Sequence, residues 1–203
     1  MSNFFYVVYP SNPELRNILN TLKVIADEDQ RTEAHITIRG PYQKKRPNIS
    51  DVNRWSSTIE GEQVQVNKVD NFFAYNQNTV FFSCGDNRML KKIWKKFTYN
   101  EFRPHITIYN GPDRKYSFKV FETLAESFKP FLYKINELSR LQPKDEIQFN
   151  RLVREVDLQF TKEILMKELA EVDFNNITNK RRIEYLRLVS KYLYETFEAI
   201  TIA

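Results

Sequence analysis

The sequence predicts an α+β fold of two similar lobes, followed by an all-helical C-terminal extension. A strand, helix, strand order occurs twice before residue 113, which predicts a pseudo-symmetric pair of lobes. Each copy ends in a strand that contains His-Ile-Thr-Ile, at residues 35–38 and 105–108. After Pro143 the chain has neither glycine nor proline, and its apolar residues recur at helical spacing. We therefore expect a domain over residues 1–142 and a helical extension over residues 143–203.

The first copy begins with an aromatic and β-branched run at residues 4–10, which predicts a buried strand. Residues 13–26 place apolar side chains three and four positions apart, so they predict a helix, with Asn12 as its N-cap. Residues 33–41 predict a second strand, which Gly40-Pro41 closes.

The second copy repeats this order. A strand is expected at residues 79–85, a helix at 88–97 and a strand at 102–112 that another Gly-Pro pair closes. The remaining elements expected are consecutive strands from residue 62 up to the second copy, a helix at 117–128 and a last strand at 131–141.

The C-terminal extension breaks at residues 175–180, where Thr178 or Asn179 is placed to cap the last helix. Its apolar stripes are typical of packing surfaces, directed either at the rest of the chain or at a second copy of it. The extension therefore predicts self-association or a protein partner as possible roles.

Composition excludes several classes of protein. The 203 residues carry a net charge of +5, and all of the excess falls within residues 1–143, which favours an anionic ligand there. The single cysteine excludes an internal disulfide and a Cys-based zinc site. No stretch reaches the roughly 18–20 apolar residues of a membrane helix, and the N-terminal apolar run lacks the features of a signal peptide. We expect a soluble, cytoplasmic protein that does not enter a membrane.

Both histidines of the chain open the repeated tetrapeptide. Side chains on a strand point alternately to its two faces, so residues two apart share a face. The isoleucines of each tetrapeptide therefore face the opposite side and are expected in the core, where burial of each stabilises the fold by about 1.5–3 kcal/mol. The groups predicted to project together are His35, Thr37 and Arg39 from the first run, and His105, Thr107 and Tyr109 from the second.

Two imidazoles suit a reaction with two proton transfers. Cleaving a phosphodiester in line needs one group to deprotonate the attacking water or hydroxyl and another to protonate the leaving oxygen, each worth about 10²–10⁴-fold. Threonine hydroxyls beside them can donate hydrogen bonds to phosphoryl oxygens. A metal site is a weaker interpretation, because each run offers one imidazole and no second ligand at zinc-binding spacing. No metal or cofactor is therefore expected.

The duplicated His-x-Thr runs, Pro104 before His105 and the bilobal order of elements resemble the 2H phosphoesterase superfamily, the LigT-like or 2'-5' RNA ligase-like fold. The resemblance covers about residues 3–141. It implies a pseudo-two-fold fold with antiparallel sheets lining a central cleft. It also implies metal-independent cleavage of 2',3'-cyclic phosphates, 2'-5' phosphodiesters or related cyclic nucleotides.

The resemblance implies that His35 and His105 are the general acid and base, and that Thr37 and Thr107 bind phosphate. Which histidine plays which part stays open. Many relatives carry Arg five residues after the second histidine, where this chain has Asn110. Arg39 on the expected cleft face is a candidate to supply a positive charge instead.

Substrate-binding candidates surround these runs. The loop 40–47 interleaves Tyr42 with Lys44, Lys45 and Arg46, a pattern suited to nucleotides. The residues expected to contact substrate are Arg39, Tyr42, Tyr109 and Tyr6.

Three classes of function fit these observations. The first is a phosphodiesterase acting on 2',3'-cyclic phosphate ends of RNA, 2'-5' oligoadenylates or cyclic oligonucleotide signals of the kind used in antiviral defence. The second is a nucleotide-sensing module that captures such a ligand without turnover and signals through the helical extension. The third is an RNA-binding scaffold, whose affinity would fall steeply with salt. The sequence favours the enzyme, because pure binding needs no paired proton-transfer groups.

Overall fold

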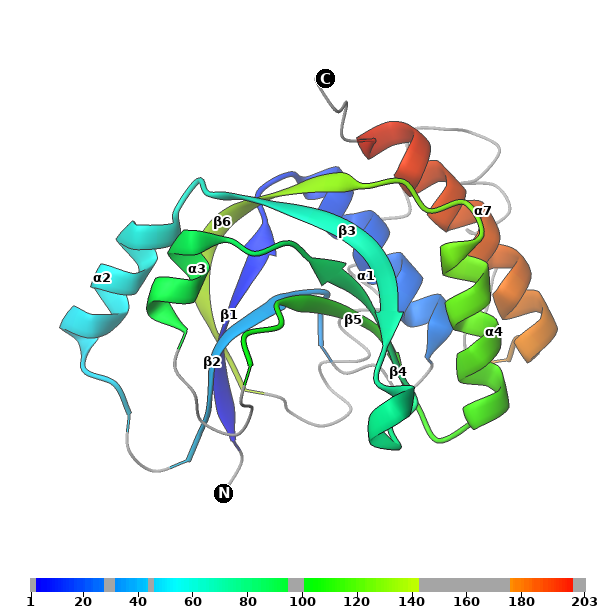
Figure 1. The fold of residues 1–203 in the computed structure, drawn as a ribbon, viewed down its shortest axis with the longest axis horizontal. Coiled ribbons are helices and arrows are strands. Elements are labelled where there is room, and N and C mark those ends of the chain that lie inside the picture. Colours follow the sequence, from blue (N-terminus) through cyan, green and yellow to red (C-terminus); the bar gives the residue numbers. More distant parts are fainter. Residues whose placement is uncertain (1–2, 28–31, 44–45, 95–100, 143–175, 199–203) are drawn as a thin grey trace.

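The computed structural model describes residues 3–27, 32–43, 46–94, 101–142 and 176–198. They form a mixed α+β structure, which confirms the predicted class. Six antiparallel strands follow one another in the order β1-β2-β5-β4-β3-β6 and close into a ring. Helices α2 and α3 lie at one end of this sheet, and α4 and α7 lie at the other (Figure 1).

The first half of the sheet region comprises β1 (Phe4–Pro10), α1 (Pro13–Ala26), β2 (Ile36–Tyr42), α2 (Ile49–Ile59) and β3 (Gln63–Asn71). A short 3-10 turn, η1 (Phe73–Tyr75), joins it to the second half. That half comprises β4 (Thr79–Cys84), α3 (Arg88–Ile93), β5 (His105–Asn110), α4 (Arg114–Ala125) and β6 (Phe131–Leu141). A strand, helix, strand, helix, strand order therefore occurs twice.

Polar caps set where the helices begin. The Asn12 side chain accepts a hydrogen bond from the Leu15 amide, as predicted, and α1 then runs over the expected 13–26. Helix α4 begins at Arg114, three residues before the predicted start, because Asp113 caps it by accepting from the Tyr116 amide.

Three elements differ from their predictions. Helix α2 was not predicted from the sequence; Asn48 caps it, and it buries only Trp55 and Ile59. Helix α3 ends at Ile93, before the predicted 97. Strand β2 continues through Gly40 to Tyr42, where a close approach requires glycine. Gly40 has a φ of 123°, and a Cβ there would lie 2.9 Å from a ring carbon of Phe5.

The strands of the two halves pair in matching registers. Val7 lies opposite Thr37 in the first half, as Phe81 lies opposite Thr107 in the second. One position further along, the pairs are Val8 with Ile36 and Phe82 with Ile106. The register shifts just beyond each threonine, between Tyr6 and Val7 and between Val80 and Phe81. The repeated sequence pattern therefore folds into repeated strand geometry.

Helix α7 (Asn179–Phe197) completes the hydrophobic core. Thr178 caps it, as one of the two predicted alternatives. It packs against α1 and α4, and its buried Leu186, Val189 and Leu193 belong to the same core cluster as the sheet. The predicted packing of this apolar stripe against the rest of the chain is confirmed. The other stripes of the extension, at residues 149–172, lie outside the described residues.

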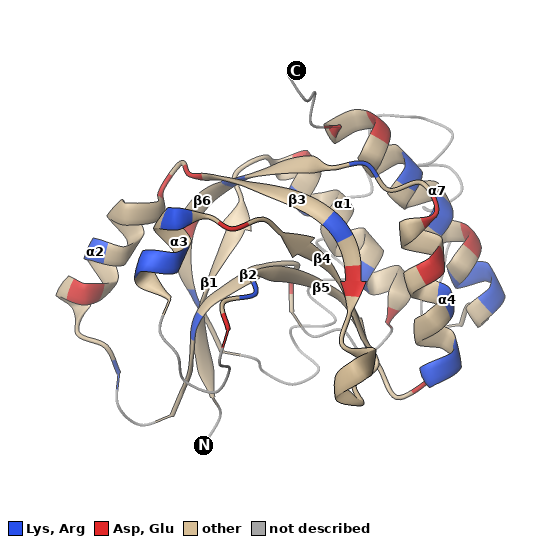
Figure 2. Cartoon of the chain, in the orientation of Figure 1, with Lys and Arg blue, Asp and Glu red and all other residues tan. Residues whose placement is uncertain are grey.

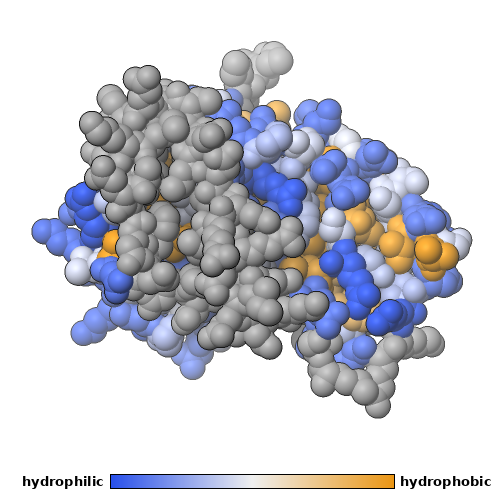
Figure 3. Space-filling view, turned by 180° about the vertical axis from the view of Figure 1, so that it is seen from behind, coloured by the Kyte–Doolittle hydropathy of each residue, from blue (hydrophilic) through white to orange (hydrophobic). Residues whose placement is uncertain are grey.

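Apolar surface gathers toward the α2 end of the back face (Figure 3), where Ile49 is 79% exposed. In the ranges that the structure describes, no helix is both long and apolar enough to cross a membrane.

Candidate functional site

The two His-x-Thr runs meet where β2 pairs with β5. Ile36 lies opposite Ile106 in this antiparallel contact. One residue to either side, the same register sets His35 opposite Thr107 and Thr37 opposite His105. The two isoleucines are fully buried, so these four side chains project from the other side of the strands. We call His35, Thr37, His105 and Thr107 the motif face.

Solvent reaches the motif face. Thr37 is exposed, and the other three residues are half-buried. Within the described part of the chain, neither threonine hydroxyl and neither imidazole Nε2 has a hydrogen-bond partner. Two hydroxyls and two ring nitrogens are therefore available to a ligand or to water.

Each imidazole is held by the main chain two residues before it. The Nδ1 of His35 lies 2.6 Å from the carbonyl oxygen of Glu33, and the Nδ1 of His105 lies 2.7 Å from that of Arg103. A carbonyl oxygen only accepts, so Nδ1 is the donor in both rings. A neutral ring held this way has its lone pair on Nε2, which is the form that a general base needs.

Both histidines are less basic than a free imidazole, and His35 is neutral at pH 7. Burial among protein atoms lowers the pKa of His35 to about 3; the positive charges of Lys23 and His105 lower it further, and the bond to the Glu33 carbonyl opposes them. Burial also lowers the pKa of His105, against its bond to the Arg103 carbonyl. Because the charge of one ring acts on the other, the two imidazoles are electrostatic neighbours.

Different side chains flank the two rings. The His105 ring lies 5.3 Å from Phe72 and 4.8 Å from Phe81, measured between ring centroids, and His105 pairs with Ser83 on β4. The His35 ring lies 6.2 Å from Tyr9. The His105 side of the motif face is therefore the more aromatic.

A polar network lies behind His35. The Glu33 carboxylate accepts hydrogen bonds from Arg16 at 2.6 Å and Asn20 at 3.3 Å, and Asn20 also accepts from the Ala34 amide. The ammonium of Lys23 reaches the Glu33 carbonyl oxygen at 3.4 Å. These contacts join α1 to the segment that enters β2, so they set the position from which His35 projects.

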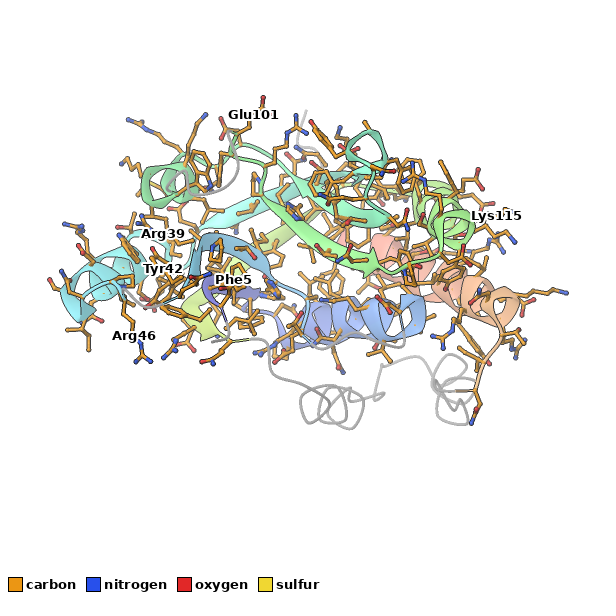
Figure 4. All side chains as sticks on the ribbon, turned by 90° about the horizontal axis from the view of Figure 1, so that it is seen from below. Phe5, Arg39, Tyr42, Arg46, Glu101 and Lys115 are labelled. Atoms are coloured by element: carbon orange, nitrogen blue, oxygen red, sulfur yellow. The ribbon has the colours of Figure 1, made fainter. Side chains whose placement is uncertain are left out.

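Three predicted substrate contacts, Arg39, Tyr42 and Tyr6, lie together. Arg39 stacks 4.0 Å above Trp55 and donates to the Ile93 carbonyl and the Tyr42 hydroxyl. Tyr6 and Tyr42 are both buried, and each packs against Phe4. Figure 4 shows Arg39 and Tyr42 close together beside α2. Lys44 and Lys45 of the adjoining loop lie outside the described residues.

The expectation that Tyr109 projects with His105 and Thr107 is wrong, because Ile108 and Tyr109 are both buried. A register shift follows the threonine in each strand. In β2 the alternation continues past the shift, with Ile38 buried and Arg39 partly exposed. Tyr109 is 3% exposed, packs against Tyr116 and places its hydroxyl 3.4 Å from the Asp113 carbonyl oxygen. Burial raises its pKa to about 12.

Most charged residues lie on the helices, and the strands are largely uncharged (Figure 2). Two cations near the motif face are already paired, Lys68 with Asp70 at 2.7 Å and Arg103 with Glu101 at 2.7 Å. Asn110 accepts a hydrogen bond from the Thr79 hydroxyl. Across the described ranges, no three side chains of His, Cys, Asp or Glu gather as a metal site would require.

Sequence reasoning missed several residues around the motif face. Lys23 carried a signal, because it lies four residues after Leu19 and eight after Leu15, on the buried side of α1. Phe72, Ser83 and Tyr75 carried none, because strand pairing and the η1 turn bring them to the site.

The comparisons with known proteins do not assign a family. No protein-family model matches the chain, and no curated protein matches its sequence.

Proposed function

We propose that this protein is a metal-independent phosphodiesterase that cleaves 2'-linked phosphodiesters, with a pseudo-two-fold fold of the 2H phosphoesterase type. The substrates that fit are 2',3'-cyclic phosphates, 2'-5' oligonucleotides and cyclic oligonucleotides. The observation that carries the proposal is the crossed arrangement at the Ile36–Ile106 contact, in which each histidine lies opposite the other run's threonine.

This arrangement suits a single phosphorus atom between the two imidazoles. Directly opposed residues of an antiparallel pair have Cβ atoms about 4.5–5.5 Å apart, so the four polar groups fit around one phosphate. One Nε2 takes the proton of the attacking oxygen as its bond to phosphorus forms. The other ring enters the step protonated on both nitrogens, and its Nε2 gives a proton to the leaving oxygen as the bond of that oxygen to phosphorus breaks. The threonine hydroxyls donate to the non-bridging oxygens.

Repetition supports the pseudo-two-fold part of the proposal. The pairs that Tyr6, Val7 and Val8 make with β2 match the pairs that Val80, Phe81 and Phe82 make with β5, and a register shift follows the threonine in each half. A rotation that exchanges the halves would exchange His35 with His105 and Thr37 with Thr107. Each half then contributes one histidine to the contact between β2 and β5, which explains why both histidines of the chain lie there.

The base of the nucleotide has a platform on the His105 side. Tyr75 is 60% exposed, and its ring lies 6.0 Å from Phe72, which contacts His105. Arg103 donates to the Tyr75 hydroxyl, and its guanidinium lies 5.8 Å from the Tyr75 ring centroid. Stacking on an exposed ring is worth about 1–3 kcal/mol per base, so Tyr75 favours nucleotides over simple phosphodiesters.

A panel of 2',3'-cyclic nucleotides, 2'-5' dinucleotides and cyclic di- and trinucleotides, with products separated by chromatography, tests the proposal. Turnover of at least one class is expected, unchanged by EDTA, and lost in both His35→Ala and His105→Ala while circular dichroism stays native. The Arg54→Ala variant, changed at an exposed residue of α2, is the matched control. Tight binding without turnover would instead identify a nucleotide-sensing module. Loss of activity with EDTA, or a near-normal rate in either histidine variant, would refute the mechanism.

A further inference from the structure

Lys23 is a buried cation that the acid and base chemistry leaves unexplained. It is 2% exposed, although lysine is rarely buried without a carboxylate partner. Its ammonium donates to the Thr32 hydroxyl at 3.3 Å and to the Glu33 carbonyl oxygen at 3.4 Å, both uncharged acceptors. Burial lowers its pKa to about 8, with Asp27 and Glu33 opposing the shift, so Lys23 remains mostly protonated at pH 7.

The Glu33 carbonyl connects Lys23 to the motif face. The same oxygen accepts from the Nδ1 of His35 at 2.6 Å, so an ammonium and an imidazole share one acceptor. The matching carbonyl of the other half, at Arg103, accepts from His105. The Arg103 guanidinium points elsewhere, to Glu101 and Tyr75. The two histidines are therefore alike in geometry and different in electrostatic environment.

The groups that face His35 come from four elements. Lys23 acts from α1, Tyr9 from β1, Glu33 from the segment before β2 and His105 from β5. The Glu33 carboxylate is committed to Arg16, so its negative charge is largely compensated. Burial raises the pKa of Tyr9 to about 12, so its hydroxyl is neutral. Of the charges that act on His35, that of Lys23 disfavours a protonated ring most.

We propose that Lys23 fixes the order of proton transfer, so that His35 is the general base and His105 the general acid. This inference rests on the proposed function. The Nε2 of His35 takes a proton from the attacking water or hydroxyl, whose oxygen forms the new bond to phosphorus. His105 enters the step protonated on both ring nitrogens. The bond to the leaving oxygen breaks, and that oxygen takes the proton from the Nε2 of His105, which leaves a neutral ring. Exchange with solvent then restores both rings. Lys23 is a positioning residue that acts through His35.

A chain with two histidines allows a direct test by NMR. In protein labelled with ¹⁵N-histidine, the two imidazoles give two sets of signals, which His35→Gln and His105→Gln assign. Both rings are expected to show hydrogen on Nδ1 at pH 7. In Lys23→Met, the titration midpoint of His35 is expected to rise by about one pH unit or more, because a nearby positive charge is removed. The midpoint of His105 is expected to move much less.

Two further variants separate charge from shape. Lys23→Arg keeps the charge and should leave the His35 midpoint low, whereas Lys91→Met removes an exposed lysine of α3 and should change neither ring. No rise of the His35 midpoint in Lys23→Met, or an equal rise for both rings, overturns the proposal. A rise in Lys23→Arg as large as in Lys23→Met also overturns it.

Kinetics links this electrostatic asymmetry to the reaction. The kinetic test uses any nucleotide of the panel that is turned over. In the pH profile of its kcat/KM, the midpoint of the acidic limb reports the pKa of the general base. That limb should move to higher pH in Lys23→Met together with the His35 midpoint. If the acidic limb stays at the same pH while the titration midpoint of His35 rises, His35 is not the general base. If no panel nucleotide is cleaved, the proposed function fails, while the NMR result still decides the influence of Lys23.

Discussion

Ile36 lies directly opposite Ile106 where β2 meets β5, and both side chains are fully buried. This contact joins the two halves of the chain at the point where their histidines and threonines face one another. Burial of the two isoleucines therefore sets the spacing of four polar groups on the other side of the strands.

Shortening this pair should weaken the fold. Ile106→Ala is expected to lower the free energy of unfolding by about 2–5 kcal/mol, because it leaves a cavity in a packed core. Ile106→Val should cost only about 0.5–1.5 kcal/mol and keep turnover close to normal. Urea denaturation measures both values. Leu132→Ala, at a residue that is 45% exposed, is the control and should stay within about 0.5 kcal/mol of the wild type. A loss of less than 1 kcal/mol in Ile106→Ala would contradict the structure.

Removing either threonine hydroxyl should slow catalysis without unfolding the chain. Thr37→Val and Thr107→Val keep the shape of the side chain and remove the hydroxyl donor that we propose binds the phosphate. We expect kcat to fall by about 10²-fold in each, a value typical of a lost donor to developing charge. Thr58→Val, at a half-buried threonine of α2 whose hydroxyl donates to the Arg54 carbonyl oxygen, serves as the control. Normal kcat in both site variants would remove the threonines from the mechanism.

The Tyr75 platform should act on substrate binding. Tyr75→Ala is expected to raise KM for a nucleotide about tenfold, because a base loses its stacking partner. Tyr75→Phe keeps the ring and should stay near the wild-type KM. Phe118→Ala removes another exposed ring, on α4, and should leave KM unchanged. An equal rise in the Phe118 variant would show that the effect is not specific to the Tyr75 platform.

Stability should fall as pH drops below about 6.5. The pKa of each histidine is lower in the folded chain than its ordinary value of 6.5. Below that pH the unfolded chain therefore binds more protons than the folded chain, and the free energy of unfolding falls. For His35 this loss extends from about pH 6.5 down to about pH 3, and between pH 7 and pH 5 it amounts to about 2 kcal/mol. His105 contributes a loss in the same direction.

The His35→Gln variant tests this dependence. Glutamine does not titrate, so the variant should lose less stability than the wild type between pH 7 and pH 5 in urea denaturation. His105→Gln should behave in the same direction. Parallel pH profiles of wild type and both variants would mean that the imidazoles titrate normally in the folded chain.

The sequence by itself determined most of the local structure. Aromatic and β-branched runs predicted β1 and β6 with their observed bounds, and Asn12 with a helical apolar pattern predicted α1. These features depend on neighbours in the chain, so residue type and spacing are enough to reveal them. Helix α2 was missed because its short amphipathic pattern buries only two side chains.

The candidate site was predictable only in part. His-x-Thr spacing indicated that each histidine shares a face with its own threonine, because alternation holds over two residues. It failed for Tyr109, which is buried next to the buried Ile108, because β5 shifts its register directly after Thr107. Such a shift depends on how neighbouring strands pair, and no residue in either run signals it.

Only the tertiary structure decided which groups meet. The pairing of Ile36 with Ile106 brings together two runs about 70 residues apart, and the docking of α1 places Lys23 behind one histidine and not the other. Two nearly identical tetrapeptides therefore acquire different surroundings. The physical reason is that a strand's own sequence sets which side chains it presents. The elements packed behind the strand set the electrostatic environment of those side chains.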